Sequence, residues 1–155
     1  MSDLGRKLLN TAKSYLGVRR EPGTCPPAIA EFLAAVGMPP NETLAWCKAF
    51  FTFVCQQCGV AIDTHPNARA LLSDPDWQRV EPADVQAGDA AVFWRGDPKG
   101  WEGHIAFVAE PPGSAGVPAG FLRVLGGNQA SSVCYENFPV NRVLAYLRPK
   151  EQADA

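Results

Sequence analysis

The residue best suited to nucleophilic chemistry is Cys47, which follows Trp46 at the expected start of an apolar helix. A thiol in a first helical turn lies at the positive end of the helix dipole, which favours the thiolate. Apolar residues at helical spacing predict that Cys47 begins a buried face, which continues through Phe50, Phe51, Val54 and Cys58. The same position suits an ordinary core cysteine, because most free cysteines are small buried residues.

A thiol nucleophile needs an imidazole within hydrogen-bond reach, and the chain holds two histidines. His65 precedes a proline in a polar loop, which is typical of a solvated turn residue. His104 follows Gly103 and opens the apolar run at residues 105–109, which predicts a buried strand. A strand end presents a side chain rigidly, so His104 is the preferred base. The alternative is that His104 has no catalytic role and only makes local hydrogen bonds at the strand end.

A third polar group must orient the imidazole, and residues 124–129 offer two amides after an apolar strand. Strand alternation places Gly126 and Asn128 on one face and Gln129 on the other. We therefore predict Asn128 as the orienting residue, with Gln129 as the alternative and as a substrate-binding candidate. A Gly-Gly-Asn hairpin turn would explain the same residues without any catalytic role.

Helices precede strands along the chain and must position these residues. Apolar residues at helical spacing predict helices over residues 4–16, 29–36 and 44–58, the last with Thr43 as N-cap, and a weaker helix over residues 67–72. Short apolar segments predict strands over residues 90–94, 104–110, 121–125, 133–135 and 142–148. Because strands and helices do not alternate, the fold class is α+β, with N-terminal helices packed on a C-terminal antiparallel sheet. We expect one domain over residues 1–150 and a flexible tail over residues 151–155.

The composition permits a packed core and argues against several functions. The 155 residues are 46% apolar, and 14 Lys+Arg against 16 Asp+Glu give a net charge of −2. This balance argues against nucleic acid as the main partner, because phosphate binding needs a basic surface. Membrane insertion is not expected, since Lys48, Gln56 and Gln57 interrupt the longest dense apolar stretch. The first seven residues do not resemble a signal peptide, so we expect synthesis in the bacterial cytoplasm.

The other cysteines suggest a redox or metal site as an alternative. Cys55 and Cys58 lie inside an apolar helix and lack the helix-start geometry of redox motifs. A zinc site would need two more ligands from Cys25, Cys134 or a histidine, at no recognised spacing. We therefore predict neither a metal nor another cofactor. The odd count of five excludes a complete disulfide framework, while one bridge from Cys25 or Cys134 after export stays open.

Together these segments resemble the papain-like peptidoglycan hydrolases of the NlpC/P60 and CHAP superfamily. The small single-domain branch, found as phage lysins and type VI secretion effectors, is the closer match. The resemblance covers nearly the whole chain through motifs in a shared order: Ala12-Lys-Ser-Tyr-Leu-Gly-Val, Ala45-Trp-Cys-Lys-Ala-Phe, Ala87-Gly-Asp-Ala-Ala-Val-Phe, Gly103-His-Ile-Ala-Phe-Val, Leu125-Gly-Gly-Asn-Gln and Val143-Leu-Ala-Tyr-Leu-Arg-Pro. Two departures are Lys48, where the family often has a small residue, and Ala87, where a proline is common. Lys48 either supports the thiolate or is a solvated helix residue, and we favour the second.

The resemblance implies a Cys-His-Asn thiol mechanism. Cys47 would be the nucleophile, His104 the general base and then the acid, and Asn128 the orienting residue. The implied substrate is an amide bond in the peptide stem of peptidoglycan, so the protein would be an amidase or endopeptidase. The candidate walls of the substrate cleft are Trp46, Trp94 and Trp101.

The resemblance also implies a place of action. An antibacterial type VI secretion effector would act in the periplasm or cell wall of a target cell, with secretion machinery and a cognate immunity protein as partners. A phage-type endolysin is the alternative among hydrolases. A non-catalytic peptidoglycan-binding module and a transferase that uses the same thioester are the alternatives outside hydrolysis.

Overall fold

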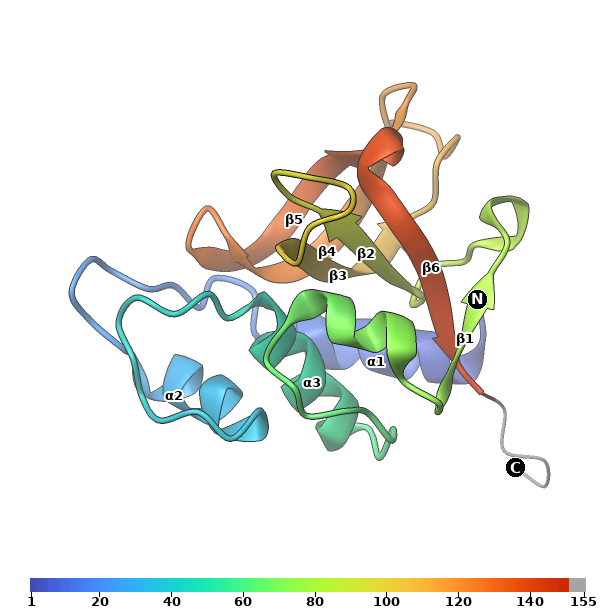
Figure 1. Cartoon of the computed structure of the whole chain (residues 1–155). Helices are drawn as coiled ribbons and strands as arrows, with labels where there is room; N and C mark the ends of the chain where they lie inside the picture. The colour runs from blue at the N-terminus through green and yellow to red at the C-terminus, as the bar shows by residue number, and fades with distance from the viewer. Residues whose placement is uncertain (151–155) are drawn as a thin grey trace.

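The computed structural model describes residues 1–150, in which three helices pack against one side of a six-stranded antiparallel sheet (Figure 1). The helices are α1 (Asp3–Lys13), α2 (Pro27–Ala35) and α3 (Cys47–Gln57). The strands are β1 (Trp77–Val80), β2 (Ala90–Trp94), β3 (Gly103–Glu110), β4 (Phe121–Gln129), β5 (Ser132–Pro139) and β6 (Val143–Pro149). Three short 3-10 segments are η1 (Ala68–Ser73), η2 (Pro82–Asp84) and η3 (Val140–Arg142). The predicted α+β class is confirmed, and the predicted tail at 151–155 lies outside the described residues.

The strands are ordered β1-β6-β2-β3-β4-β5, with every neighbouring pair antiparallel. Strand β1 was not predicted, because it is only four residues long and belongs to the sheet through its pairing with β6. Within residues 1–150, every helix is too short or too polar to span a bilayer.

The start of α3 differs from the prediction. Asn41 Oδ1 accepts hydrogen bonds from the backbone N–H groups of Thr43 and Leu44, at 2.7 and 2.8 Å. These bonds hold residues 41–44 in a turn, so the helix begins at Cys47 and Thr43 is not its N-cap. Cys47 therefore lies in the first helical turn, and no side chain caps the free N–H groups of that turn.

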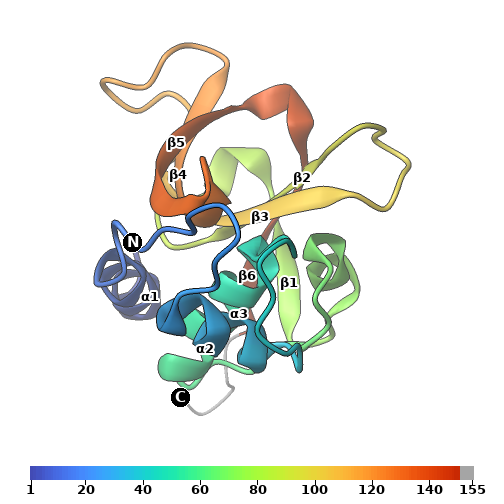
Figure 2. The ribbon, with the colours of Figure 1, turned by 90° about the vertical axis from the view of Figure 1, so that its left-hand side faces the viewer.

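Two apolar clusters lie on opposite faces of the sheet. The larger cluster joins the helices to the sheet, and within it Phe51 of α3 stacks on Phe107 of β3 with ring centroids 4.2 Å apart. The smaller cluster consists of Ala91, Phe93, Ala106, Val108, Leu122, Val124 and Tyr146. Phe138 of β5 also packs against this second cluster. The ribbon of the sheet is strongly curved (Figure 2). The larger cluster holds α3 against strands β3 and β4.

Two glycines of strand β4 lie in close contact with their surroundings, Gly127 on the side of α3 and Gly126 on the side of Gln129. A Cβ atom on Gly127 would lie 2.7 Å from Phe50 Cβ and 2.8 Å from the Trp46 ring. A Cβ atom on Gly126 would lie 2.7 Å from Gln129 Oε1. Such contacts are far inside van der Waals distance, so the Gly-Gly pair lets the strand lie between the helix and the Gln129 side chain. The hairpin turn comes later, at Ala130–Ser131, where both residues have positive φ.

Candidate active site

Cys47 is buried, with 6% of its surface exposed. Burial raises the pKa of the Cys47 thiol above its usual value. Backbone hydrogen bonds from Ile105, Lys48 and Cys47 itself, and the positive charge of Arg95, lower that pKa by less than burial raises it. The predicted stabilisation of the thiolate at the helix start is therefore present but outweighed, and the resting thiol is protonated. The interaction with the Ile105 backbone brings the thiol to the start of β3, the strand that carries His104.

His104 is completely buried at the second position of β3. Its ring stacks on Phe138, with centroids 4.9 Å apart and planes 11° from parallel, and Phe93 lies on the same side of the sheet. Burial lowers the pKa of His104 to about 4, and the charge of Arg95 acts in the same direction, while a hydrogen bond from the ring to Gln129 opposes both. The imidazole is therefore neutral near pH 7 and able to accept a proton.

The Gln129 amide determines which imidazole nitrogen is basic. Gln129 Nε2 donates a hydrogen bond to the backbone oxygen of Cys134 at 2.7 Å, so Oε1 faces His104 Nε2 at 2.9 Å. An amide oxygen can only accept, so the proton of the neutral ring lies on Nε2. Nδ1 keeps its lone pair and is the basic atom of the site.

The prediction that Asn128 faces the imidazole is wrong in this geometry. The pairing of β4 with β5 shifts register between Gly126 and Gln129, and Asn128 has a φ of 57°. This irregularity breaks the two-residue alternation and brings the Gln129 side chain onto the face of Gly126 and His104. Asn128 is half-buried, and its side chain makes no hydrogen bond within residues 1–150. Gln129 in turn is 2% exposed with both amide atoms engaged, so it is not available to bind substrate.

Lys48 is not the solvated helix residue that we favoured. Its side chain is fully buried, and Nζ donates to the backbone oxygens of Asp63 and His65, at 2.8 and 2.9 Å. Burial lowers the pKa of Lys48, against the attraction of Asp63 and other acidic groups. The ammonium group thus ties the loop before η1 to the first turn of α3, directly beside Cys47.

The three tryptophans have different environments. Trp46 is fully buried and stacks on Phe32 of α2 at 5.9 Å, so it is a core residue and the prediction of a cleft wall is wrong for it. Trp94 is half-buried under the Arg142 guanidinium, whose carbon lies 4.9 Å from the ring centroid. Trp101 is 72% exposed and lines a surface hollow of about 360 Å³. The other residues of the hollow are His65, Asn67, Arg69, Ala70 and Gly100.

The loop between β2 and β3 carries a site residue that we did not predict. Arg95 Nη2 lies 3.5 Å from His104 Nδ1, and its charge also reaches the Cys47 thiol. Arg69 of η1 holds this loop through hydrogen bonds to the backbone oxygens of Asp97, Pro98 and Glu102, at 2.8 to 3.0 Å. The position of Arg95 shortly before Gly103-His104 was the one available signal in the sequence.

No other reactive cluster occurs within residues 1–150. All five cysteines are free thiols, and no three His, Cys, Asp or Glu side chains there are grouped to hold a metal ion. Cys58 Sγ lies 3.3 Å from the Thr11 hydroxyl, and burial raises the pKa of Cys55 well above its usual value. His65 is exposed, and its Nδ1 accepts from the backbone N–H of Asn67, as expected of a turn residue.

Several solved structures share this fold. An NLP/P60-family protein from Staphylococcus aureus, described as similar to lipoprotein, matches 98% of this chain with a TM-score of 0.63 and 14% identity. The wild-type endolysin LysIME-EF1 matches 99% of this chain with a TM-score of 0.62 and 19% identity. RipD from Mycobacterium tuberculosis, described as a non-catalytic NlpC/p60 domain protein adapted to peptidoglycan binding, matches 95% with a TM-score of 0.55 and 11% identity.

The chain therefore has an NlpC/P60 fold, as the sequence resemblance implied. It spans 43% of the staphylococcal protein, 67% of the endolysin and 97% of RipD. No protein-family model matches the sequence, and no curated protein matches it.

Proposed function

We propose that this protein is a cysteine hydrolase that cleaves an amide bond in the peptide stem of peptidoglycan. Cys47 is the nucleophile, His104 the general base and then acid, and Gln129 the orienting residue. The observation that carries the proposal is the hydrogen bond between Gln129 Oε1 and His104 Nε2, which leaves Nδ1 as the basic nitrogen. Arg95 lies 3.5 Å from this nitrogen, and its charge also acts on the thiol at the start of α3. A buried neutral imidazole with a defined tautomer is what a thiol nucleophile requires of its base.

The reaction follows from these positions. His104 Nδ1 takes the thiol proton as sulfur attacks the amide carbon. The negative oxygen that forms is met by backbone N–H groups at the start of α3, which no side chain caps. The imidazolium then gives its proton to the leaving amine, and a thioester to Cys47 remains. His104 finally deprotonates a water molecule, which hydrolyses the thioester and restores the thiol.

The shared fold supports the substrate class, because its neighbours include an endolysin and a protein described as adapted to peptidoglycan binding. The latter is described as non-catalytic, so a binding module is the second candidate function. A binder has no need of a thiol, a neutral imidazole and an orienting amide in one site, which favours hydrolysis.

Purified sacculi, incubated with wild type or Cys47→Ala, test this function through mass spectrometry of the soluble products. We expect fragments from wild type alone, with masses that identify the cleaved bond. Retention on sacculi without release of fragments would instead support the binding module. Equal release by both proteins would refute Cys47 as nucleophile, and products joined to an added amine would indicate a thioester transferase.

The place of action is part of the same proposal. We propose that the protein is an antibacterial effector, delivered by secretion machinery to the periplasm or cell wall of a target cell and neutralised in its producer by an immunity protein. The support is the resemblance of its motifs to small single-domain effectors. A bacterial host that expresses the chain with an added periplasmic leader should lyse, and the Cys47→Ala variant should not lyse it. If no protein encoded beside the gene protects this host, the effector proposal fails and the endolysin alternative gains support.

A further inference from the structure

The Arg95 guanidinium lies against Nδ1 of His104, the basic atom of the site. Arg95 Nη2 lies 3.5 Å from His104 Nδ1, the nitrogen that must accept the thiol proton. Nδ1 carries the lone pair, so the guanidinium is the donor in this contact. At 3.5 Å the hydrogen bond is long and weak, and it can be given up for a better acceptor.

Arg95 is also free to bind an anion. Its side chain is exposed, and it forms no ion pair within residues 1–150. Its backbone is nevertheless held, because the Arg95 N–H donates to the oxygen of Glu102 at 3.1 Å and the Arg95 oxygen accepts from the N–H of Asp97 at 2.7 Å. The three hydrogen bonds from Arg69 to this loop add to that anchoring. An exposed cation on an anchored backbone therefore lies beside His104 Nδ1.

We propose that Arg95 is the carboxylate-binding residue of this site, which takes substrates with a free carboxylate next to the scissile amide. The substrate carboxylate pairs with the guanidinium and draws it away from His104 Nδ1, which leaves that nitrogen free to accept the thiol proton. Binding of the correct substrate thus positions the amide and releases the base in one step. This inference rests on the proposed function and names the feature of the substrate that the site selects.

The balance of charges favours this assignment. An arginine and a carboxylate form paired, charge-assisted hydrogen bonds, which are stronger than a single long contact to a neutral imidazole. A neutral amide in place of the carboxylate cannot form this ion pair. The site would therefore separate free from amidated stems.

The test uses two synthetic stem peptides, in which the carboxyl group next to the scissile amide is either free or amidated. Wild type should cleave the free form with a kcat/KM about 10- to 100-fold higher, the range expected for a charge-assisted hydrogen bond. Arg95→Met should abolish this preference, mainly by raising KM for the free form. Its rate on the amidated form should fall less than its rate on the free form, because only the free form pairs with the guanidinium. Arg95→Lys should restore part of the preference.

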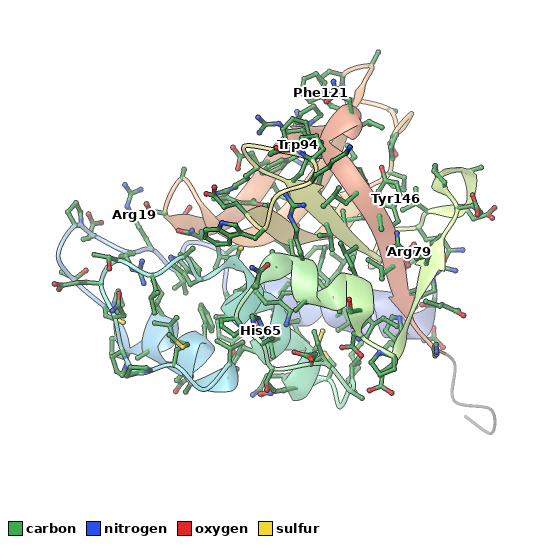
Figure 3. All side chains as sticks on the ribbon, viewed as in Figure 1. Arg19, His65, Arg79, Trp94, Phe121 and Tyr146 are labelled. Atoms are coloured by element: carbon green, nitrogen blue, oxygen red, sulfur yellow. The ribbon has the colours of Figure 1, made fainter. Side chains whose placement is uncertain are left out.

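The matched control is Arg79→Met, which removes the same charge from an exposed side chain on β1, far from Trp94 and the loop that follows it (Figure 3). It should leave the preference unchanged. A wild type that cleaves both peptides within about twofold of each other, or an Arg95→Met variant that slows both equally, would overturn the inference.

A second measurement does not depend on hydrolysis. The Cys47 thiolate should react faster with iodoacetate, relative to neutral iodoacetamide, when Arg95 attracts the carboxylate. Mass spectrometry of the peptide that contains Cys47 measures both rates, and Arg95→Met should lower their ratio several-fold. If wild type cleaves neither peptide, the proposed function fails, and this ratio still decides whether Arg95 binds carboxylates beside the thiol. An unchanged ratio would refute the inference.

Discussion

At the scale of single residues, the site depends on an amide whose two ends are both used. Gln129 donates to the Cys134 backbone oxygen through Nε2 and accepts from His104 through Oε1. The first bond fixes the direction of the amide, and the second then fixes the tautomer of the imidazole. Gln129 thus determines, through its hydrogen bond to His104, which nitrogen of the imidazole can act as base.

Gln129→Ala should lower kcat at least 100-fold, because the imidazole loses its orientation and the preference for the reactive tautomer, and general-base catalysis contributes about 10² to 10⁴. Asn128→Ala is the neighbouring control and should retain kcat within about threefold, since its side chain holds no other group within residues 1–150. Steady-state kinetics on a soluble stem peptide measure both variants. A large loss in Asn128→Ala with an active Gln129→Ala would contradict the arrangement.

The buried imidazole also links stability to pH. The pKa of His104 is about 4 in the folded protein and near 6.5 when exposed. Below pH 6.5 the unfolded chain takes up a proton that the folded chain does not, so the free energy of unfolding falls as pH decreases from 6.5 towards 4. The loss over this window is about 3 kcal/mol, and little of it occurs above pH 6.5.

Urea unfolding at pH 7, 6, 5 and 4.5 measures this contribution. Wild type and His65→Gln, which alters the exposed histidine, should lose stability in parallel across the window. His104→Gln should keep most of the free energy of unfolding that wild type loses between pH 7 and pH 4.5, because Gln does not titrate. Identical profiles for His104→Gln and wild type would mean that the imidazole is not buried in a neutral form.

At the scale of elements, the first turn of α3 is connected to the loop before η1 by one cation. Lys48 Nζ satisfies two backbone oxygens, those of Asp63 and His65, inside the protein. The same loop leads into η1, whose Arg69 anchors the segment that carries Arg95. Loss of the lysine would therefore loosen the side of the site formed by η1 and the β2–β3 loop.

Lys48→Met keeps the length of the side chain and removes the donor. We expect a loss of about 1 to 3 kcal/mol in the free energy of unfolding, because the carbonyl groups of Asp63 and His65 lose a charged donor. Lys13→Met, in the exposed last turn of α1, should change stability by less than about 0.5 kcal/mol. Chemical denaturation measures the free energy of unfolding of both variants. Equal losses would show that the Lys48 hydrogen bonds do not stabilise the fold.

At the scale of the whole molecule, an ion pair joins strand β6 to the residue that precedes β2. Arg148 of β6 contacts Asp89, the residue before β2, through Nε at 2.7 Å and Nη2 at 2.8 Å. The Asp89 side chain is 4% exposed, and its Oδ2 also accepts from the backbone N–H of Gln86. The pair thus connects the C-terminal strand to the turn that introduces β2.

Asp89→Asn should lower the free energy of unfolding by about 2 kcal/mol, because it removes the negative charge from the buried acceptor of two Arg148 hydrogen bonds. Glu21→Gln breaks the pair of Arg19 with Glu21, whose side chains are 61% and 64% exposed, and should cost less than about 0.5 kcal/mol. Thermal unfolding of the two variants at equal ionic strength separates the cases. Similar melting temperatures for both would refute the role of the Asp89 pair.

The α+β class and most of the elements could be predicted because apolar periodicity reports local backbone geometry. Strand β2 coincides with the predicted residues 90–94, and His104 lies at the start of a buried strand as expected. The sequence by itself also placed Cys47 at a helix start, since the apolar face that follows it is a local pattern.

The tertiary structure decided what those local patterns do not contain. Asn128 and Gln129 are adjacent amides, and only the register shift between β4 and β5 determined which one reaches His104. Lys48 is a charged residue that is nevertheless buried, because two carbonyl oxygens from a distant loop accept hydrogen bonds from its ammonium group. Arg95 meets His104 only through the return of β3 alongside β2. Each of these contacts joins segments whose approach depends on strand pairing and packing, and no periodicity along one segment encodes it.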